Sequence, residues 1–336
     1  MSNRILPLLL GWLSAMAVGA LAGCGPGGGD GAEQDKLKIA ASIPPQKWLI
    51  ERIAGDRADV FIMLPPGASP HAHAPTDRDA TRVIQSRVYF SIGVEFEEKG
   101  RWFRAVEQAA SDGRLSIINT QMGIPLRRME DHVHGDDVDE QHRHEHDHDQ
   151  NGHGHDHDDH DHDDDDEHHH HHHHDGDDPH IWTSPRLLRL QARTIAAALA
   201  AVDPEHRRIY ERNLRSTLDE LTELEREIRA KLEPHRGGAM LVYHPAWGYF
   251  TEAFGLRQVP VEISGRQPTD AELTRLLRAA REEGTRTVFV QPQISGAAAQ
   301  AVADQIDGQV VRIDPLAEDV AANLRQVARR LAESFE

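Results

Sequence analysis

Residues 204–232 read PEHRRIYERNLRSTLDELTELEREIRAKL, an unusually long helical pattern. Apolar side chains recur in it at steps of three, four and seven residues, which predicts one amphipathic helix. The stripe consists of Tyr210, Leu214, Leu218, Leu221, Ile228 and Leu232. Pro204 suits the first helical turn after Asp203 as N-cap, and Pro234 ends the pattern. At ~1.5 Å per residue the helix would be about 40 Å long. We therefore expect it to connect the parts of the chain before and after it rigidly, so that they move only slightly relative to each other.

Short β-rich runs alternate with helical patterns on both sides of this helix. Before it, strands are predicted at Lys38–Ile43, Val60–Leu64, Val88–Gly93 and Ser116–Asn119, and helices near Gln46–Ala54, Asp77–Ser86, Gly100–Ala110 and Pro185–Ala201. After it, strands are predicted at Ala239–His244, Gln258–Ile263, Thr287–Gln291 and Gln309–Asp314, and helices at Tyr249–Phe254, Asp270–Glu283, Ala297–Gln305 and Val320–Phe335. This alternation is typical of parallel βαβ units. The predicted fold class is α/β, with two parallel-sheet lobes joined by one long rigid helix.

The charge of the chain is concentrated in one segment. The 336 residues carry a formal net charge of −19, with 24 His and one Cys. Residues 131–178 hold 20 of the acidic residues and 18 of the His but a single basic residue, so the remainder is formally neutral. A nucleic acid partner is excluded because no net positive field is available to neutralise phosphates. The low-complexity segment is too polar to bury a core, and we expect it to be a disordered insert.

The N-terminus predicts export. Arg4 precedes a short apolar run, and small residues lead into Leu21-Ala22-Gly23-Cys24. This tetrapeptide resembles the bacterial lipobox, in which the Cys is acylated and becomes the mature N-terminus. An ordinary signal peptide with an incidental Cys is the alternative. A single Cys also excludes an internal disulfide framework and a Cys-rich zinc finger.

The predicted domain organisation follows from these segments. It comprises a lipoprotein signal peptide (1–24), a flexible tether (25–36), an N-terminal lobe (37–203) with the insert at 130–178, a linking helix (204–234) and a C-terminal lobe (235–336). We expect a lipid-anchored protein outside the cytoplasm, periplasmic or at the cell surface, with the membrane contacted through lipid on Cys24.

Three His outside the insert, with one Asp, stand at the ends of predicted elements. His71 lies in a proline-rich turn after a strand, His180 precedes a helix, and His244 and Asp314 each end a strand. In open α/β sheets, ligands bind at the carboxyl ends of the strands. These four side chains are therefore candidates to converge in the cleft between the lobes. Three imidazoles and one carboxylate make a tetrahedral set suited to Zn²⁺.

Several motifs around these residues resemble the zinc-uptake (ZnuA-type) branch of the cluster A-I solute-binding proteins of bacterial ABC transporters. The matching stretches are Leu64-Pro65-Pro66-Gly67 with Pro70-His71, Pro179-His180-Ile181-Trp182 with Ser184-Pro185, Asp203-Pro204 with Tyr210 and Asn213, His244-Pro245-Ala246-Trp247-Gly248-Tyr249-Phe250, and Asp314-Pro315-Leu316. The resemblance runs from about Leu37 to the C-terminus. It implies two lobes joined by a long helix, with His71, His180, His244 and Asp314 as metal ligands between them.

The chain departs from the family pattern just after the first His, and with a single Cys it cannot form the disulfide that many zinc-binding members carry in the second lobe. His73-Ala74 stands where an aromatic residue and a Glu are often found, so His73 is an alternative ligand. In some zinc-binding relatives water or another carboxylate takes the fourth position, which leaves Asp314 as the least secure ligand. Imidazole at His244 favours zinc over manganese, although Cu²⁺ would compete by affinity order alone.

The resemblance implies the extracytoplasmic zinc-binding component of an ABC importer, with an ABC permease as partner and a monomeric state. The insert, with seven consecutive His at 168–174, is expected to bind several additional Zn²⁺ ions weakly. A His-rich metal storage protein or adhesin is the alternative. A zinc hydrolase is disfavoured because the one His-Glu-x-x-His stretch, at residues 144–148, falls in the low-complexity insert rather than in a predicted helix. No general base is paired with the candidate ligands, so we expect no catalysis.

Overall fold

The computed structural model describes residues 36–97, 100–129, 176–262 and 266–336. The predicted signal peptide with Cys24, all of the predicted tether but Lys36, and the insert as far as residue 175 lie outside these described residues. Within them, no helix combines the length and the apolar character that crossing a bilayer requires.

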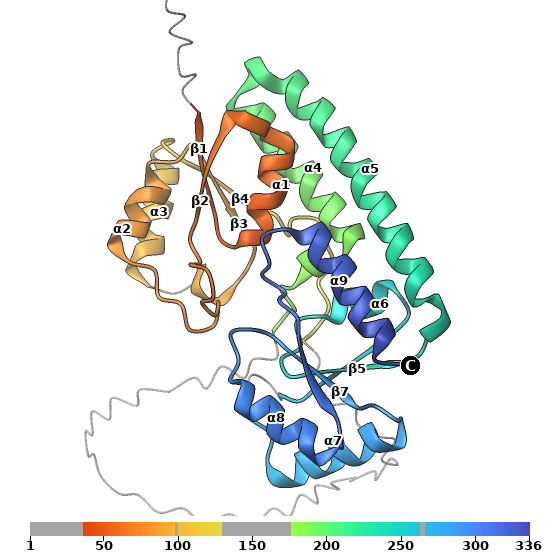
Figure 1. Cartoon of the computed structure of the whole chain (residues 1–336). Helices are drawn as coiled ribbons and strands as arrows, with labels where there is room; N and C mark the ends of the chain where they lie inside the picture. The colour runs from red at the N-terminus through yellow and green to blue at the C-terminus, as the bar shows by residue number, and fades with distance from the viewer. Residues whose placement is uncertain (1–35, 98–99, 130–175, 263–265) are drawn as a thin grey trace, which may run out of the picture. The chain divides into compact units, whose positions relative to one another are not determined.

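The first half of the chain forms one parallel sheet. Its strands are β1 (Leu37–Ala41), β2 (Ala58–Ile62), β3 (Val88–Ser91) and β4 (Ser116–Asn119), in the order β2-β1-β3-β4. Its helices are α1 (Pro44–Ala54), α2 (Asp77–Ile84), α3 (Arg101–Ser111) and α4 (Pro185–Val202). Figure 1 shows α2 and α3 together on one side of the sheet and α1 and α4 on the other. The central strand β3 is buried along its whole length, as expected for a strand covered on both faces.

The second half repeats this arrangement. Strands β5 (Ala239–Val242), β6 (Arg257–Pro260), β7 (Thr287–Val290) and β8 (Gln309–Arg312) form a parallel sheet in the order β6-β5-β7-β8. Its helices are α6 (Gly248–Ala253), α7 (Asp270–Glu282), α8 (Gly296–Gln305) and α9 (Val320–Glu333). Alternate residues of the strands face opposite sides. Leu241 and Val288 pack with residues of α7 and α8, whereas Val242 and Phe289 join a larger core with α9.

Helix α5 (Arg207–Leu232) contacts helices of both halves. It packs against α1 and α4 of the first half and against α9 of the second half, as can be followed in Figure 1. The Asn213 side chain donates to the Ile53 carbonyl at 3.0 Å, and Arg325 of α9 donates to Glu227 at 2.6 Å. The predicted α/β class, with two parallel sheets and a long helix, is confirmed.

The start of α5 differs from the prediction. Residues Pro204–His206 form a 3₁₀ turn before the α-helix, and Asp203 makes no side-chain cap. Its carboxylate instead accepts hydrogen bonds from the His206 imidazole, at 2.9 Å, and from the Tyr210 hydroxyl. The sequence alone did not reveal that His206 and Tyr210, rather than the backbone amides of the helix, donate to the Asp203 carboxylate.

The strand orders place a ligand-binding edge in each half. In both sheets the strand order reverses direction between the two central strands, β1 and β3 or β5 and β7. At such a switch point the loops leave the carboxyl ends of neighbouring strands in opposite directions. The segments that follow β2, β3 and β5 contain His71, Glu95 and His244.

Candidate metal centre

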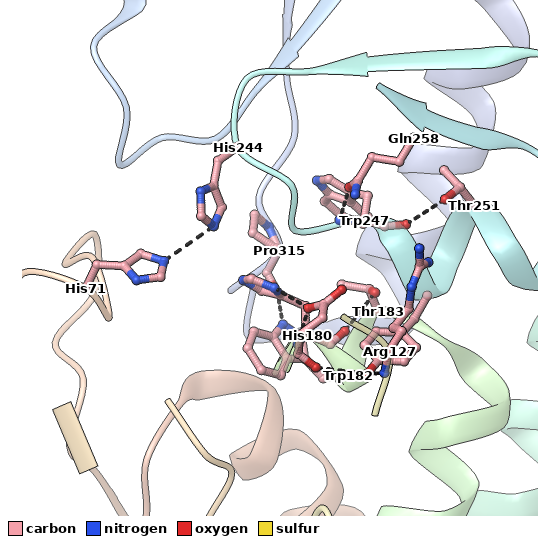
Figure 2. Close-up of polar contacts among 12 residues, drawn as sticks. His71, Arg127, His180, Trp182, Thr183, His244, Trp247, Thr251, Gln258 and Pro315 are labelled. Carbon is pink, nitrogen blue, oxygen red and sulfur yellow. Dashed lines mark hydrogen bonds and ion pairs between the residues drawn. The ribbon is translucent and has the colours of Figure 1, made fainter. Parts of the chain in front are cut away.

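The segment of His71 is a chain of tight turns after β2. Gly67 has a φ of +78°, a conformation that favours glycine, and the amide of Ala68 donates to the Pro65 carbonyl at 3.1 Å. The next turn is closed by the His73 amide, which donates to Ser69. These turns direct the half-exposed imidazole of His71 towards the second half of the chain (Figure 2).

His180 lies at the start of a short turn that leads into α4. Its carbonyl accepts from both the amide and the hydroxyl of Thr183, at 3.1 and 2.9 Å. The indole of Trp182 donates to the carbonyl of Pro315 at 2.7 Å, which ties this turn to the loop after β8. The imidazole of His180 is only 7% exposed.

His244 follows β5 within two residues. The sheet pairing continues past the end of the strand, because the Glu262 amide donates to the Tyr243 carbonyl at 2.9 Å. Pro245 then breaks the strand, and α6 begins at Gly248. The His244 side chain is buried, with 7% exposure.

The three imidazoles converge, and we call His71, His180 and His244 the metal cluster. One ring nitrogen of each lies within 4.8 Å of the others. Figure 2 shows His71 and His244 facing each other, with their Nε2 atoms 3.4 Å apart. Two nitrogens bound to one tetrahedral Zn²⁺ at ~2.05 Å would be about 3.4 Å apart, so this pair already has the required spacing.

A different carboxylate holds each imidazole at Nδ1. The contacts are His71 with Glu95 at 3.2 Å, His180 with Asp178 at 2.7 Å and His244 with Glu262 at 2.8 Å. A carboxylate at Nδ1 selects the tautomer that carries its proton there and leaves Nε2 free to bind a metal. It also makes the imidazole a stronger ligand.

The site predicted from the sequence did not include these three carboxylates. Asp178 stands two residues before His180, and its proximity was a usable signal. Glu95 and Glu262 are 24 and 18 residues from their partners, and only the folded sheets bring them there. Glu97 supports the turn of Glu95, because its carboxylate accepts from the amides of Ile92 and Gly93. Burial raises the pKa of Glu97 to about 7.

The electrostatics of the cluster favour neutral imidazole at His71. Its partial burial and the neighbouring His244 lower the pKa of His71, and Glu95 opposes this shift. A neutral imidazole is the form that binds metal. At neutral pH, His71 can therefore accept a cation with little competition from protons.

The two remaining candidate ligands lie outside the cluster. Asp314 is not among the grouped nitrogen and oxygen donors, and its Oδ1 accepts from the Leu316 amide at 2.9 Å and from Gln293 at 3.3 Å. His73 packs its ring edge-on against Phe96, and its Nε2 is buried without a hydrogen-bond partner. The assignment of ligands to a bound ion, Asp314 included, stays a prediction.

Comparisons with known proteins identify relatives and solved structures that are similar to this chain. A relative from Paracoccus denitrificans (strain Pd 1222), the "High-affinity zinc uptake system protein ZnuA", is 35% identical over 262 residues, which is 77% of each chain. A solved structure described as "Crystal structure of ZnuA" has a TM-score of 0.73 and 30% identity, covering 90% of this chain and 100% of that one. A second, "Crystal structure of 138-173 ZnuA deletion mutant plus zinc bound", has a TM-score of 0.72 and 30% identity, covering 89% and 98%.

The match to the family extends over nearly all of the described chain. The model of the family described as "Zinc-uptake complex component A periplasmic" matches residues 39–334. That range includes the three imidazoles, their carboxylate partners, both sheets and α5. The resemblance drawn from the sequence motifs is thereby confirmed, and the chain belongs to the ZnuA family of periplasmic zinc-uptake components.

Proposed function

We propose that this protein is the extracytoplasmic zinc-binding component of an ABC importer and that His71, His180 and His244 bind the transported Zn²⁺. The observation that carries the proposal is the convergence of three imidazoles, each with a carboxylate at Nδ1. Imidazole suits zinc, whereas a site for Mg²⁺ or Mn²⁺ would be built mainly from oxygen ligands.

Asp314 is the proposed fourth ligand. It immediately precedes Pro315, whose carbonyl accepts the Trp182 indole proton two residues after His180. This hydrogen bond ties the Asp314 loop to the turn that begins at His180, which supports Asp314 as the ligand that would complete a tetrahedral set. A closed set of four protein ligands fits a carrier, because a catalytic zinc keeps one position open.

We further propose that the protein has no catalytic turnover. A zinc hydrolase needs a carboxylate or imidazole positioned to activate water. Asp178, the most buried of the three carboxylates, already accepts from both the amide and the Nδ1 of His180. This arrangement suits ligand orientation rather than proton transfer.

The proposed assembly is a monomer anchored through lipid on Cys24 that delivers zinc to the permease of an ABC transporter. The tetrapeptide ending at Cys24 and the family membership of the chain support it. We also retain the domain boundaries proposed from the sequence, with a linking helix at 204–234 between lobes 37–203 and 235–336. The contacts of α5 with α4 and α9 are consistent with that division.

The insert is proposed to bind additional Zn²⁺ ions more weakly than the metal cluster. Its many His side chains are interchangeable ligands, and fixing a polypeptide segment around an ion costs conformational entropy. The metal cluster is held in place by the fold and avoids most of this cost.

Zinc affinity of the mature chain, measured by competition with a chelator, tests the proposal. We expect His180→Ala to weaken the tightest site by more than about 100-fold, since even outer partners of a ligand contribute 10–100-fold. His73→Ala is the matched control and should leave affinity unchanged. Asp314→Asn should weaken the site if this carboxylate is the fourth ligand.

An uptake assay separates an importer from a storage protein. Cells lacking the gene should take up zinc poorly from zinc-poor medium, and the wild-type chain but not His180→Ala should restore uptake. Tight binding that survives His180→Ala would overturn the assigned site. Normal uptake without the gene would overturn the importer function.

A further inference from the structure

The two chain segments that lead into and out of the insert form a short antiparallel pair. We call these segments, Arg127–Met129 and Gly176–Asp178, the insert root. Arg128 pairs with Asp177, the Asp178 amide donates to the Arg127 carbonyl at 2.7 Å, and the Met129 amide donates to Gly176 at 3.1 Å. The insert is therefore closed at its base by backbone hydrogen bonds.

One side chain from the second half of the chain joins both segments of the root. The hydroxyl oxygen of Tyr249 accepts from the Arg127 amide at 3.0 Å, and the same hydroxyl donates to the Asp178 carbonyl at 2.8 Å. Tyr249 is only 6% exposed, and burial raises its pKa to about 12, so the donor proton is retained at neutral pH.

The residues next to this hydroxyl also pack closely against the insert root. Gly248 stands directly before Tyr249, and a Cβ at that position would lie 2.7 Å from the Arg127 guanidinium and 3.2 Å from the Asp178 carboxylate. The Arg127 guanidinium also lies 5.6 Å from the centre of the Tyr249 ring. Any side chain at this position would therefore require the Arg127 guanidinium to move.

Both ends of this link lead to the metal cluster. Tyr249 lies five residues after His244, on the helix that begins just beyond that ligand. Asp178 is the residue whose Oδ1 accepts from the amide and Nδ1 of His180, at 2.9 and 2.7 Å. The hydroxyl thus connects the segment of one ligand with the backbone of the residue whose carboxylate orients another.

We propose that Tyr249 is a positioning residue for the metal centre: its hydroxyl holds the insert root in register and thereby sets the orientation of His180 relative to His244. The inference rests on the proposed zinc function. In this proposal the insert root affects the zinc affinity of the metal cluster, whether or not the insert itself binds zinc.

Tyr249→Phe in the full mature chain tests this role, because phenylalanine keeps the ring packed and removes only the hydroxyl. Thr251→Val is the matched control. Thr251 is a buried residue of the same helix, and its hydroxyl donates only to the helix carbonyls of Trp247 and Gly248. Zinc affinity of the tightest site, the visible absorption of bound Co²⁺ and the unfolding temperature of the metal-free chain are measured for each variant.

We expect Tyr249→Phe to weaken zinc binding about 10-fold, the lower end of the range for outer partners of a ligand, and to alter the Co²⁺ spectrum. Thr251→Val should change neither the zinc affinity nor the Co²⁺ spectrum, even if it lowers the unfolding temperature as much as Tyr249→Phe does. In combination with Asp178→Asn, the loss should be less than the product of the single losses, because both changes act through His180.

Unchanged affinity and an unchanged Co²⁺ spectrum in Tyr249→Phe would overturn the inference. Fully multiplicative losses with Asp178→Asn would also overturn it. Where wild type binds zinc tightly and His180→Ala does not, the proposed zinc site stands. Either of these two results would then count only against the role of Tyr249. Failure of His180→Ala to weaken binding would instead count against the proposed function.

Discussion

The three imidazoles of the metal cluster are not equally buried, and the difference matters for protons. His180 and His244 are almost fully buried, whereas the His71 side chain is 44% exposed. Even so, the pKa of His71 is lowered by its surroundings and by His244. The ordinary pKa of a free imidazole is about 6.5.

This difference predicts that acid removes zinc from the chain in two stages. A lowered pKa means that protons displace the metal from His71 only at a pH below the ordinary imidazole range. On acidification we expect the weak sites to be lost first, as pH falls through about 6.5, while the tight site persists to lower pH. Equilibrium dialysis against zinc at a series of pH values measures both. Loss of the tight site before the weak ones would contradict the assignment.

At the scale of elements, α5 stabilises the protein through one apolar face. Tyr210, Leu221, Ile228 and Leu232 of the predicted stripe are fully buried, and Leu224 lies beside them. The long helix is otherwise polar, so its position depends on this face. The amphipathic pattern predicted the buried side correctly, although Leu214 and Leu218 are only partly buried.

Leu221→Ala should lower the free energy of unfolding by about 2–5 kcal/mol, the usual cost of a cavity in a packed core. Leu190→Ala is the control, because Leu190 on α4 is 38% exposed and should change stability by no more than about 0.5 kcal/mol. Urea unfolding of the metal-free chain measures both values. Equal effects of the two substitutions would show that the packed face of α5 is not what holds the helix in place.

At the scale of the whole molecule, the metal cluster exists only when both halves are folded. His71 and His180 come from the first half and His244 from the second. An ion bound there stabilises the native state, since the unfolded chain has no such site. Ions on the insert should bind the folded and unfolded chains alike and contribute little.

Zinc at 100 times the dissociation constant of the tight site should therefore raise the free energy of unfolding by about 2.7 kcal/mol. The same zinc concentration should have little effect on His180→Ala, which retains the whole insert. Denaturant unfolding with and without zinc makes the comparison. Equal stabilisation of both proteins would place the responsible zinc on the insert.

The sequence by itself determined the elements and the residues that bear the chemistry. Period-two and period-3.6 patterns are local, so all eight strands and the long helix were predictable within a few residues. Each His of the metal cluster also stands in a short motif at the end of an element. Family motifs and strand ends were sufficient to select these three residues from 24 His.

Only the tertiary structure decided which distant groups hold His71 and His244. Glu262 reaches His244 because β5 and β6 pair in one register, and Glu95 reaches His71 because β3 lies two strands from β2. The link through Tyr249 joins residues 71 positions apart. Such contacts depend on where strands and helices come together in space, and no local pattern in the chain encodes them.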